Sequence, residues 1–222
     1  MKLRIAQPMP HSTRANRFLR WSRNVFLVAG VLALGYAGFV LLHTKLYQAY
    51  QSRRFQQQLS SVRPAGAPTG GARPLVVVPI APTPGETLGR IEIARLGVTA
   101  IVLEGVDDQT LRRAVGHIPG TSLPGEQGNL GIAGHRDTFF RALRNIHKDD
   151  EVTLTTLGGT YHYLVDSTHV VGPEDTQVLD DSSGMTLTLV TCYPFYFVGH
   201  APKRFIVRAH EIPGENEMAR HE

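Results

Sequence analysis

The amino-acid sequence predicts an all-β domain, a small barrel or sandwich with short helices, preceded by a single N-terminal transmembrane helix. Two observations predict this fold class. Val25–Leu42 is a run of 18 residues without a charge, which is long enough to cross a bilayer as a helix. From Thr87 onward the chain consists of short apolar segments separated by glycine and proline, with little helical periodicity. Such a pattern is typical of small β-barrels and sandwiches.

The Val25–Leu42 run is best interpreted as an uncleaved membrane anchor. As a helix it would be about 27 Å long, close to the thickness of the hydrocarbon core. A cleaved signal peptide usually has a shorter apolar region and ends in a small-residue cleavage site, which residues 45–48 do not offer. A buried core helix is disfavoured because the run is apolar on all sides and flanked by arginines.

The basic residues predict the orientation of this anchor. Arginines are concentrated just before the apolar run, at Arg14, Arg17, Arg20 and Arg23. By the positive-inside rule, the N-terminus is expected in the cytoplasm and the rest of the chain outside it. The expected localisation is therefore the cell (inner) membrane, with one membrane crossing, a cytoplasmic N-terminus and an extracytoplasmic C-terminal domain.

The net charge of +4 conceals two regions of opposite charge. Residues 1–85 contain 11 Lys or Arg and no acidic residue, whereas residues 86–222 contain all 19 acidic residues and 12 basic ones, a formal charge of −7. The basic residues thus belong to the segment around the anchor and not to the expected globular domain. Nucleic-acid binding is disfavoured for this reason.

Composition along the chain predicts five regions. We expect a basic cytoplasmic N-terminus over 1–24, the anchor over 25–42, a stalk and Pro/Gly-rich linker over 43–85, the β-domain over 86–211 and a tail over 212–222. Residues 62–74 are rich in proline and glycine and cannot build a core. Residues 75–80 could form an edge strand or no regular structure.

Within the β-domain, apolar and β-branched runs predict the strands. These runs are Gly89–Ile93, Val98–Leu103, Leu130–Ala133, 152–156, Thr160–Val165, Met185–Thr191 and Arg204–Glu211. Asp108 is expected to cap a short helix that extends through Arg113. Residues 137–143 are expected to form one or two helical turns.

Cys192, the only cysteine, is the main candidate for a nucleophile. One cysteine excludes an intrachain disulfide framework and a multi-cysteine metal site. A lone cysteine is more often a small buried apolar residue. Here, however, it ends a predicted strand just before Pro194, where the thiol is reachable. An unpaired thiol has no disulfide role in an extracytoplasmic domain, which favours catalysis.

Thiol acyl transfer also needs a proton-transferring group and a stabilising cation. A histidine can take the thiol proton and return it to a leaving amine, and an arginine stays charged and can stabilise an oxyanion. His135 and Arg204 are the candidates, but the chain has 10 histidines. His200 and His117 therefore remain alternatives to His135 on residue type alone.

Two neighbours of His135 have ordinary interpretations. Asp137 could orient the imidazole, but a turn cap is favoured. Arg136 is expected to form a surface salt bridge. The chain has no metal-ligand spacing such as HExxH.

Several segments, taken together in this order, resemble the sortase family between Thr87 and Glu211. They are Leu88–Ile93, Val102–Gly105, Asn129–Arg136, the TLxTC-like Thr188–Cys192 and Lys203–Val207. The sequence around His135–Phe140 and Cys192–Phe195 is most similar to the class D branch.

This resemblance implies an eight-stranded sortase-like β-barrel and a cysteine transpeptidase, a hydrolase that acts on peptide bonds. Cys192 would attack an LPxTG-like C-terminal sorting signal to form a thioester, His135 would be the acid/base group, and Arg204 would hold the substrate or stabilise the oxyanion. The implied partners are surface proteins with a sorting signal, an amine acceptor derived from cell wall or pilin, and the membrane through Val25–Leu42. No cofactor or metal is implied.

Two alternatives are weighed against this interpretation. The L,D-transpeptidases also place one catalytic cysteine on a β-rich fold, but their motif has Ser-x-Gly before the cysteine and an arginine soon after it. The sequence around Cys192 has neither. The second alternative is a tethered module without catalysis, in which Cys192 is inert and reacts slowly with alkylating reagents.

Overall fold

The computed structural model describes residues 13–61, 81–197 and 199–212. They form a long helix, α1 (Thr13–Ser61), and eight strands with short helices between them. The chain divides into two compact units, Met1–Lys45 and Leu46–Glu222. The expected linker over 62–74, the possible strand over 75–80, the tail after Ile212 and the first 12 residues lie outside the described part.

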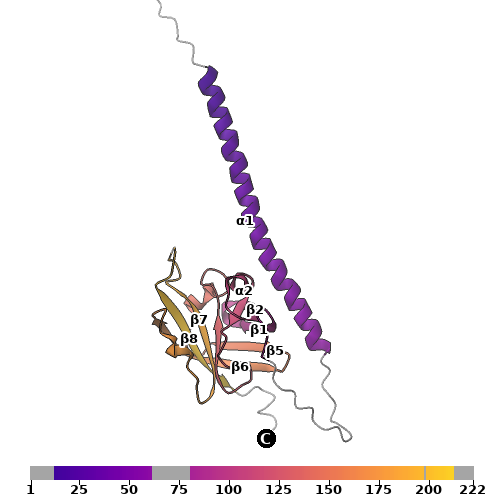
Figure 1. Cartoon of the computed structure of the whole chain (residues 1–222), viewed down its shortest axis with the longest axis vertical. Helices are drawn as coiled ribbons and strands as arrows, with labels where there is room; N and C mark the ends of the chain where they lie inside the picture. Colours follow the sequence, from indigo (N-terminus) through magenta and orange to yellow (C-terminus); the bar gives the residue numbers. More distant parts are fainter. Residues whose placement is uncertain (1–12, 62–80, 198, 213–222) are drawn as a thin grey trace, which may run out of the picture. The chain divides into compact units, whose positions relative to one another are not determined.

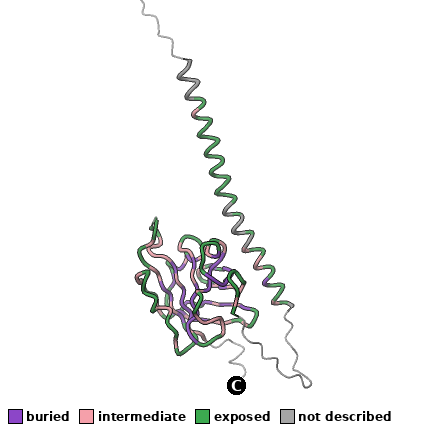
Figure 2. The backbone as a smooth tube through the Cα atoms, viewed as in Figure 1, coloured by how far each residue is buried: buried purple, intermediate pink, exposed green. Residues whose placement is uncertain are grey.

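Helix α1 contains the apolar segment of the first unit. Its stretch Arg20–Phe39 is long and apolar enough to cross a membrane, and none of it is buried. Apolar side chains such as Phe26 and Leu34 are exposed along it, and the tube in Figure 2 is green over most of this helix. An apolar surface of this length is unfavourable in water and favourable in lipid. The helix is therefore a candidate transmembrane segment, and it overlaps the predicted span.

The second unit is built on a closed eight-stranded barrel, which confirms the expected fold class (Figure 1). Around the barrel the strands follow the order β1-β2-β3-β4-β7-β8-β6-β5. The β2–β3 and β4–β7 pairs are parallel, and the other neighbours are antiparallel. The strands are β1 (Thr87–Ile93), β2 (Val98–Glu104), β3 (Val115–His117), β4 (Gly128–Ala133), β5 (Glu151–Thr156), β6 (Thr160–Val171), β7 (Met185–Tyr193) and β8 (Lys203–Ile212).

Alternating side chains fill the barrel interior. Ile91 and Ile93 of β1 and Leu187 and Leu189 of β7 are fully buried, because successive side chains of a strand point to opposite faces. The purple segments of Figure 2 follow these strands. Closure of the barrel gives each of these strands a hydrogen-bonded neighbour on both sides.

The helical connections differ in part from the prediction. Helix α2 (Asp108–Arg113) is present, but Asp107 and not Asp108 caps it, since the Asp107 carboxylate accepts from the backbone N–H groups of Gln109 and Thr110. The expected cap was therefore wrong by one residue. Three 3₁₀ helices complete the unit: η1 (Ala94–Leu96), η2 (Arg141–Asn145) and η3 (Thr176–Leu179). One or two helical turns were expected over residues 137–143. In the structure, residues 137–140 belong to a turn, and helical structure begins only at Arg141.

Candidate active site

Strand pairing brings the three candidate segments to one end of the barrel. Strands β4 and β7 run in parallel and are paired up to Ala133 and Val190. His135 lies two residues after Ala133, and Cys192 lies two residues after Val190. On the other side of β7, Cys192 is the direct antiparallel partner of Arg204 in β8. Because the two segments run in the same direction, both residues lie at the same end of this strand pair.

Two hydrogen bonds continue the connection between β4 and β7 past the last ladder pair. The Gly134 N–H donates to the carbonyl of Val190 at 3.0 Å, and the Thr191 hydroxyl donates to the carbonyl of Gly134 at 2.7 Å. Thr191 is buried, so water does not compete for this bond. The residues that precede His135 and Cys192 are therefore tied directly to each other.

A cavity of about 450 Å³ opens at this edge of the barrel. His135, Cys192 and Arg204 all line it, and so do Arg136, Asp137, Gly199, His200 and Ala201. Cys192, His135 and Arg204 are half-buried. The side chains of Cys192 and His135 form no hydrogen bond with any residue in the described ranges.

Aromatic side chains next to Cys192 and Arg204 pack against one another. Tyr193, next to Cys192, stacks on Phe205, next to Arg204, with the ring centroids 6.3 Å apart. Phe195 packs edge-on against both rings, at 6.0 and 5.2 Å. Such pairs add stabilisation beyond the area they bury, and they fix the end of β7 against the start of β8.

The two arginines of the cavity both bind backbone carbonyls. Arg204 donates from Nη1 to Ala201 and Lys203. Arg136 donates to Pro194, Phe197 and Gly199. The prediction that Arg136 forms a surface salt bridge is therefore wrong for the part of the chain that the structure describes. The partners of Arg136 are neutral carbonyls of the segment that joins β7 to β8. No sequence pattern marks these acceptors, since every residue carries a carbonyl.

The other polar residues near His135 have different positions. His200 lines the cavity, as chain proximity to Cys192 suggested. Asp137 lines it too, but its side chain makes no hydrogen bond to the described residues, so neither a turn cap nor an orienting contact with His135 is formed. Within the same residues, no group of three His, Cys, Asp or Glu side chains could hold a metal ion.

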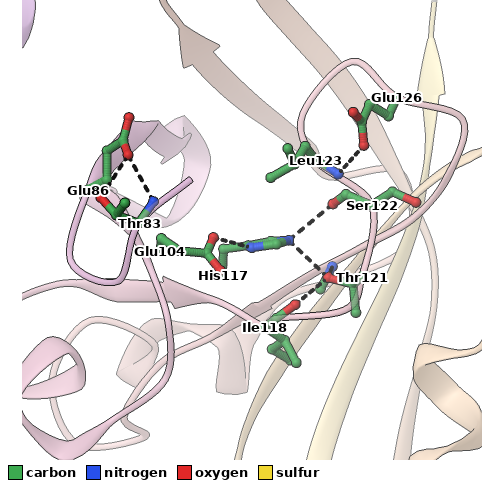
Figure 3. Close-up of polar contacts among 10 residues, drawn as sticks. Thr83, Glu86, Glu104, His117, Ile118, Thr121, Ser122, Leu123 and Glu126 are labelled. Carbon is green, nitrogen blue, oxygen red and sulfur yellow. Dashed lines mark hydrogen bonds and ion pairs between the residues drawn. The ribbon is translucent and has the colours of Figure 1, made fainter. Parts of the chain in front are cut away.

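His117 is removed from the candidates because it is buried elsewhere in the barrel. Figure 3 shows its ring between Glu104 and the segment Thr121–Ser122. Its Nδ1 lies 2.6 Å from the Glu104 carboxylate, and its Nε2 lies 3.1 Å from the carbonyl of Ser122 and 3.0 Å from the Thr121 hydroxyl. Only 2% of His117 is exposed, so it cannot reach a substrate.

Comparison with known proteins identifies relatives of this chain. Residues 91–212 match the family model of the sortase domain. Sortase D of Bacillus subtilis is 31% identical over 82% of this chain and 92% of its own length. Sortase SrtE1 of Streptomyces coelicolor is 26% identical over 77% of this chain and 51% of its own length.

Solved structures show the same similarity in three dimensions. A sortase D5 transpeptidase of Clostridium perfringens superimposes with a TM-score of 0.55 at 33% identity, covering 60% of this chain and 82% of that one. Sortase A of Corynebacterium diphtheriae gives a TM-score of 0.55 at 33% identity, covering 58% of this chain and 62% of that one. The domain match, the relatives and the closed barrel together show that this chain belongs to the sortase family of transpeptidases.

Proposed function

We propose that this protein is a membrane-anchored cysteine transpeptidase that cleaves an LPxTG-like C-terminal sorting signal and transfers the cleaved protein to an amine at the cell surface. The observation that carries the proposal is the cavity lined jointly by Cys192, His135 and Arg204. These three side chains supply the nucleophile, the acid/base group and the cation that thiol acyl transfer requires.

In the first half-reaction, His135 takes the proton of the Cys192 thiol, and the resulting thiolate Sγ attacks the carbonyl carbon of the threonyl peptide bond in the sorting signal. The carbonyl oxygen gains negative charge, which the guanidinium of Arg204 stabilises. The C–N bond then breaks, and His135 donates a proton to the leaving amine. The product is a thioester between Cys192 and the N-terminal part of the substrate.

In the second half-reaction, an amine attacks the thioester carbon. His135 accepts the proton that the amine loses, the C–S bond breaks, and Cys192 leaves as a thiolate. The protein substrate is now joined to the amine by an amide bond. We propose that the acceptor amine comes from the cell wall or a pilin, and that surface proteins carrying the sorting signal are the acyl donors.

Helix α1 would hold the barrel at the outer face of the cell (inner) membrane. The candidate span Arg20–Phe39 supports anchoring, and the arginines that precede the apolar run support a cytoplasmic N-terminus. A reporter fused after Glu222 should be active only outside the cytoplasm. Reporter activity inside the cytoplasm would reverse the orientation.

The proposed chemistry is tested by the intact mass of the full chain in detergent, incubated with a panel of LPxTG-like peptides. We expect a mass gain equal to the N-terminal peptide fragment, released by hydroxylamine and absent in Cys192→Ala. Absence of an adduct with any peptide, together with slow alkylation of Cys192, would support an inert cysteine and overturn the proposal.

A matched pair of variants identifies the acid/base group, because His135 and His200 line the same cavity. His135→Ala should lose adduct formation almost completely, whereas His200→Ala should retain most of it. The reverse result would transfer the acid/base role to His200 and leave the thioester chemistry in place.

A further inference from the structure

The side chain of Arg136 connects the histidine segment to the segment between β7 and β8. Its Nη1 donates to the carbonyl of Pro194 at 3.1 Å. Its Nη2 donates to the carbonyls of Phe197 at 2.8 Å and Gly199 at 2.9 Å. The guanidinium carbon also lies 5.9 Å from the centroid of the Phe197 ring. Three backbone carbonyls of one loop thus converge on one side chain.

The chemistry of arginine suits this arrangement. Hydrogen bonds from a charged donor are about twice as strong as neutral ones, and the planar guanidinium presents several N–H groups in a fixed geometry. Arg136 pairs with no carboxylate in the described part of the chain, so its hydrogen bonds are directed to this loop. An ammonium group, with its single centre of charge, cannot reproduce three contacts at these positions.

The loop that Arg136 holds forms a wall of the candidate site. Gly199, His200 and Ala201 line the cavity together with Cys192, and the carbonyl of Ala201 accepts from Arg204. Any movement of the loop therefore changes both the cavity and the surroundings of Arg204.

Burial alone does not fix the outer part of this loop. Tyr196 is 77% exposed and Phe197 is 46% exposed, so neither ring is anchored in the core. Phe195 packs at the base of the loop, while Gly199 adopts a φ of 103°. The hydrogen bonds from Arg136 thus span the part of the loop that packing leaves least restrained.

We infer that Arg136 is a positioning residue for the transpeptidation reaction: it fastens residues 194–197 and 199–201, between β7 and β8, to the segment of His135 and thereby sets the cavity in which a substrate meets Cys192. This inference rests on the proposed function. Arg136 acts through the loop and does not itself take part in bond making or breaking.

Arg144 provides a matched control on the same loop. Its guanidinium carbon lies 5.4 Å from the centroid of the Tyr196 ring, but among the described residues it donates no hydrogen bond to the loop backbone. An exposed cation–aromatic contact contributes only about 0.5–1 kcal/mol. Removal of Arg144 therefore changes charge and ring contacts near the loop without removing its backbone tether.

The test compares Arg136→Gln, Arg136→Lys and Arg144→Gln in the full chain in detergent, with a sorting peptide and an amine as substrates. We expect Arg136→Gln to lower kcat about ten- to hundredfold, since a misplacement of about 1 Å can have an effect of that size, while KM changes less than threefold. Arg136→Lys should stay at least tenfold below the parent, and Arg144→Gln should stay within twofold of it.

Hydrogen exchange gives a readout that does not depend on turnover. The backbone N–H of Phe197 donates to the carbonyl of Pro194, and its exchange should accelerate in both Arg136 variants but not in Arg144→Gln. Alkylation of Cys192 by a small reagent should be unchanged, because β7 is held independently by β4 and β8.

The outcomes separate this inference from the proposed function. If the parent forms no acyl-enzyme, the proposed function fails, and hydrogen exchange still tests whether Arg136 holds the loop. If the parent is active and Arg136→Gln keeps kcat within twofold with unchanged exchange, the positioning role is wrong. If both Arg136 variants unfold well below the melting temperature of the parent, Arg136 is a residue of general stability and the inference is also overturned.

Discussion

The hydroxyl of Thr191 donates a 2.7 Å hydrogen bond to the backbone carbonyl of Gly134. Thr191 precedes Cys192 and Gly134 precedes His135, so one buried bond joins the segments that carry the proposed nucleophile and the proposed acid/base group. The side chain thus continues a parallel strand pair after the backbone ladder has ended. Together with the bond from the Gly134 N–H to the carbonyl of Val190, this contact joins the two segments directly.

Removing the hydroxyl of Thr191 should therefore impair both stability and catalysis. Thr191→Val keeps the shape of the side chain but leaves the Gly134 carbonyl without a partner, which should lower the free energy of unfolding by about 1–3 kcal/mol. Thr191→Ser retains the donor and is the control. We expect denaturant unfolding and single-turnover acylation to be impaired in the valine variant and largely restored in the serine variant. If the two variants unfold and acylate alike, the hydroxyl of Thr191 contributes neither to stability nor to acylation.

Gly134 itself has no room for a side chain. A Cβ atom at this position would lie 2.7 Å from a ring carbon of Phe140, which is fully buried. Gly134→Ala should lower the free energy of unfolding by about 1–3 kcal/mol through overpacking and reduce acylation by shifting His135. The control is Gly184→Ala, where a Cβ atom meets nothing within 4 Å. Adding Phe140→Leu should recover part of the loss, and failure to do so would point to a backbone effect instead of the clash.

Side-chain periodicity predicted most of this barrel, but not its shortest strand. The sequence pattern indicated β1, β2, β5 and β8 because alternation and β-branched residues are local properties. Strand β3 was missed, since Val115–His117 is only three residues long and buried throughout. It exists because β2 and β4 flank it on both sides, and such pairing is a tertiary property that three residues cannot encode.

The ends of elements were also less predictable than their existence. Strand β6 continues to Val171, past the expected end at Val165, through a polar stretch that pairs with β8 across a register shift. The cap of α2 is Asp107 because its extended backbone conformation, φ −66° and ψ 161°, aims the carboxylate at the first turn. Two adjacent aspartates cannot be distinguished in this role from sequence alone.

The candidate site was predictable only as far as motifs reach. The motifs around His135, Cys192 and Arg204 indicated these residues, and the structure places all three around one cavity. The contacts of Arg136 could not be foreseen because the carbonyls it binds lie 58 to 63 residues away along the chain. Hydrogen bonds to the backbone leave no signature in residue type.

The buried pair of Glu104 and His117 yields a third prediction (Figure 3). The carbonyl of Ser122 can only accept a hydrogen bond, so Nε2 of His117 donates to it. On the other side of the ring, Nδ1 of His117 shares a hydrogen bond with the buried carboxyl group of Glu104. Glu104→Leu removes one partner and should lower the free energy of unfolding by about 3 kcal/mol. Glu104→Gln keeps a hydrogen-bonding partner and should lose less. Equal urea midpoints for parent and Glu104→Leu would show that the pair contributes little to stability.

Stability should depend on acidic pH through Asp150. A hydrogen bond from Arg95 holds the pKa of Asp150 below its ordinary value, aided by the backbone N–H of His147 and opposed by burial. A carboxyl group whose pKa is depressed by folding stabilises the fold above its unfolded pKa of about 3.9, and this contribution is lost as the pH falls through the folded value.

Asp150→Asn removes this contribution. The difference in unfolding free energy between parent and variant should therefore be constant near neutral pH and shrink below about pH 4. Denaturant titrations at a series of pH values measure it. Asp108→Asn, which alters an exposed 4.0 Å ion pair with Arg112, is the control. A difference for Asp150→Asn that grows as the pH falls would contradict the assigned sign.

The last prediction concerns Arg204, which faces Cys192 across the β7–β8 ladder. One nitrogen of its guanidinium already donates to the carbonyls of Ala201 and Lys203, which leaves the other N–H groups for a substrate oxygen. Arg204→Lys keeps the charge, but a single ammonium cannot hold these carbonyls and a developing oxyanion at once. Acylation should fall about a hundredfold or more, the typical effect of losing one oxyanion donor, while alkylation of Cys192 by a small reagent is unchanged. Arg208→Lys, four residues further along the same strand, is the matched control and should remain active. If Arg204→Lys keeps most of its acylation rate, the positive charge alone suffices, and the planar geometry assigned to Arg204 in the transition state is wrong.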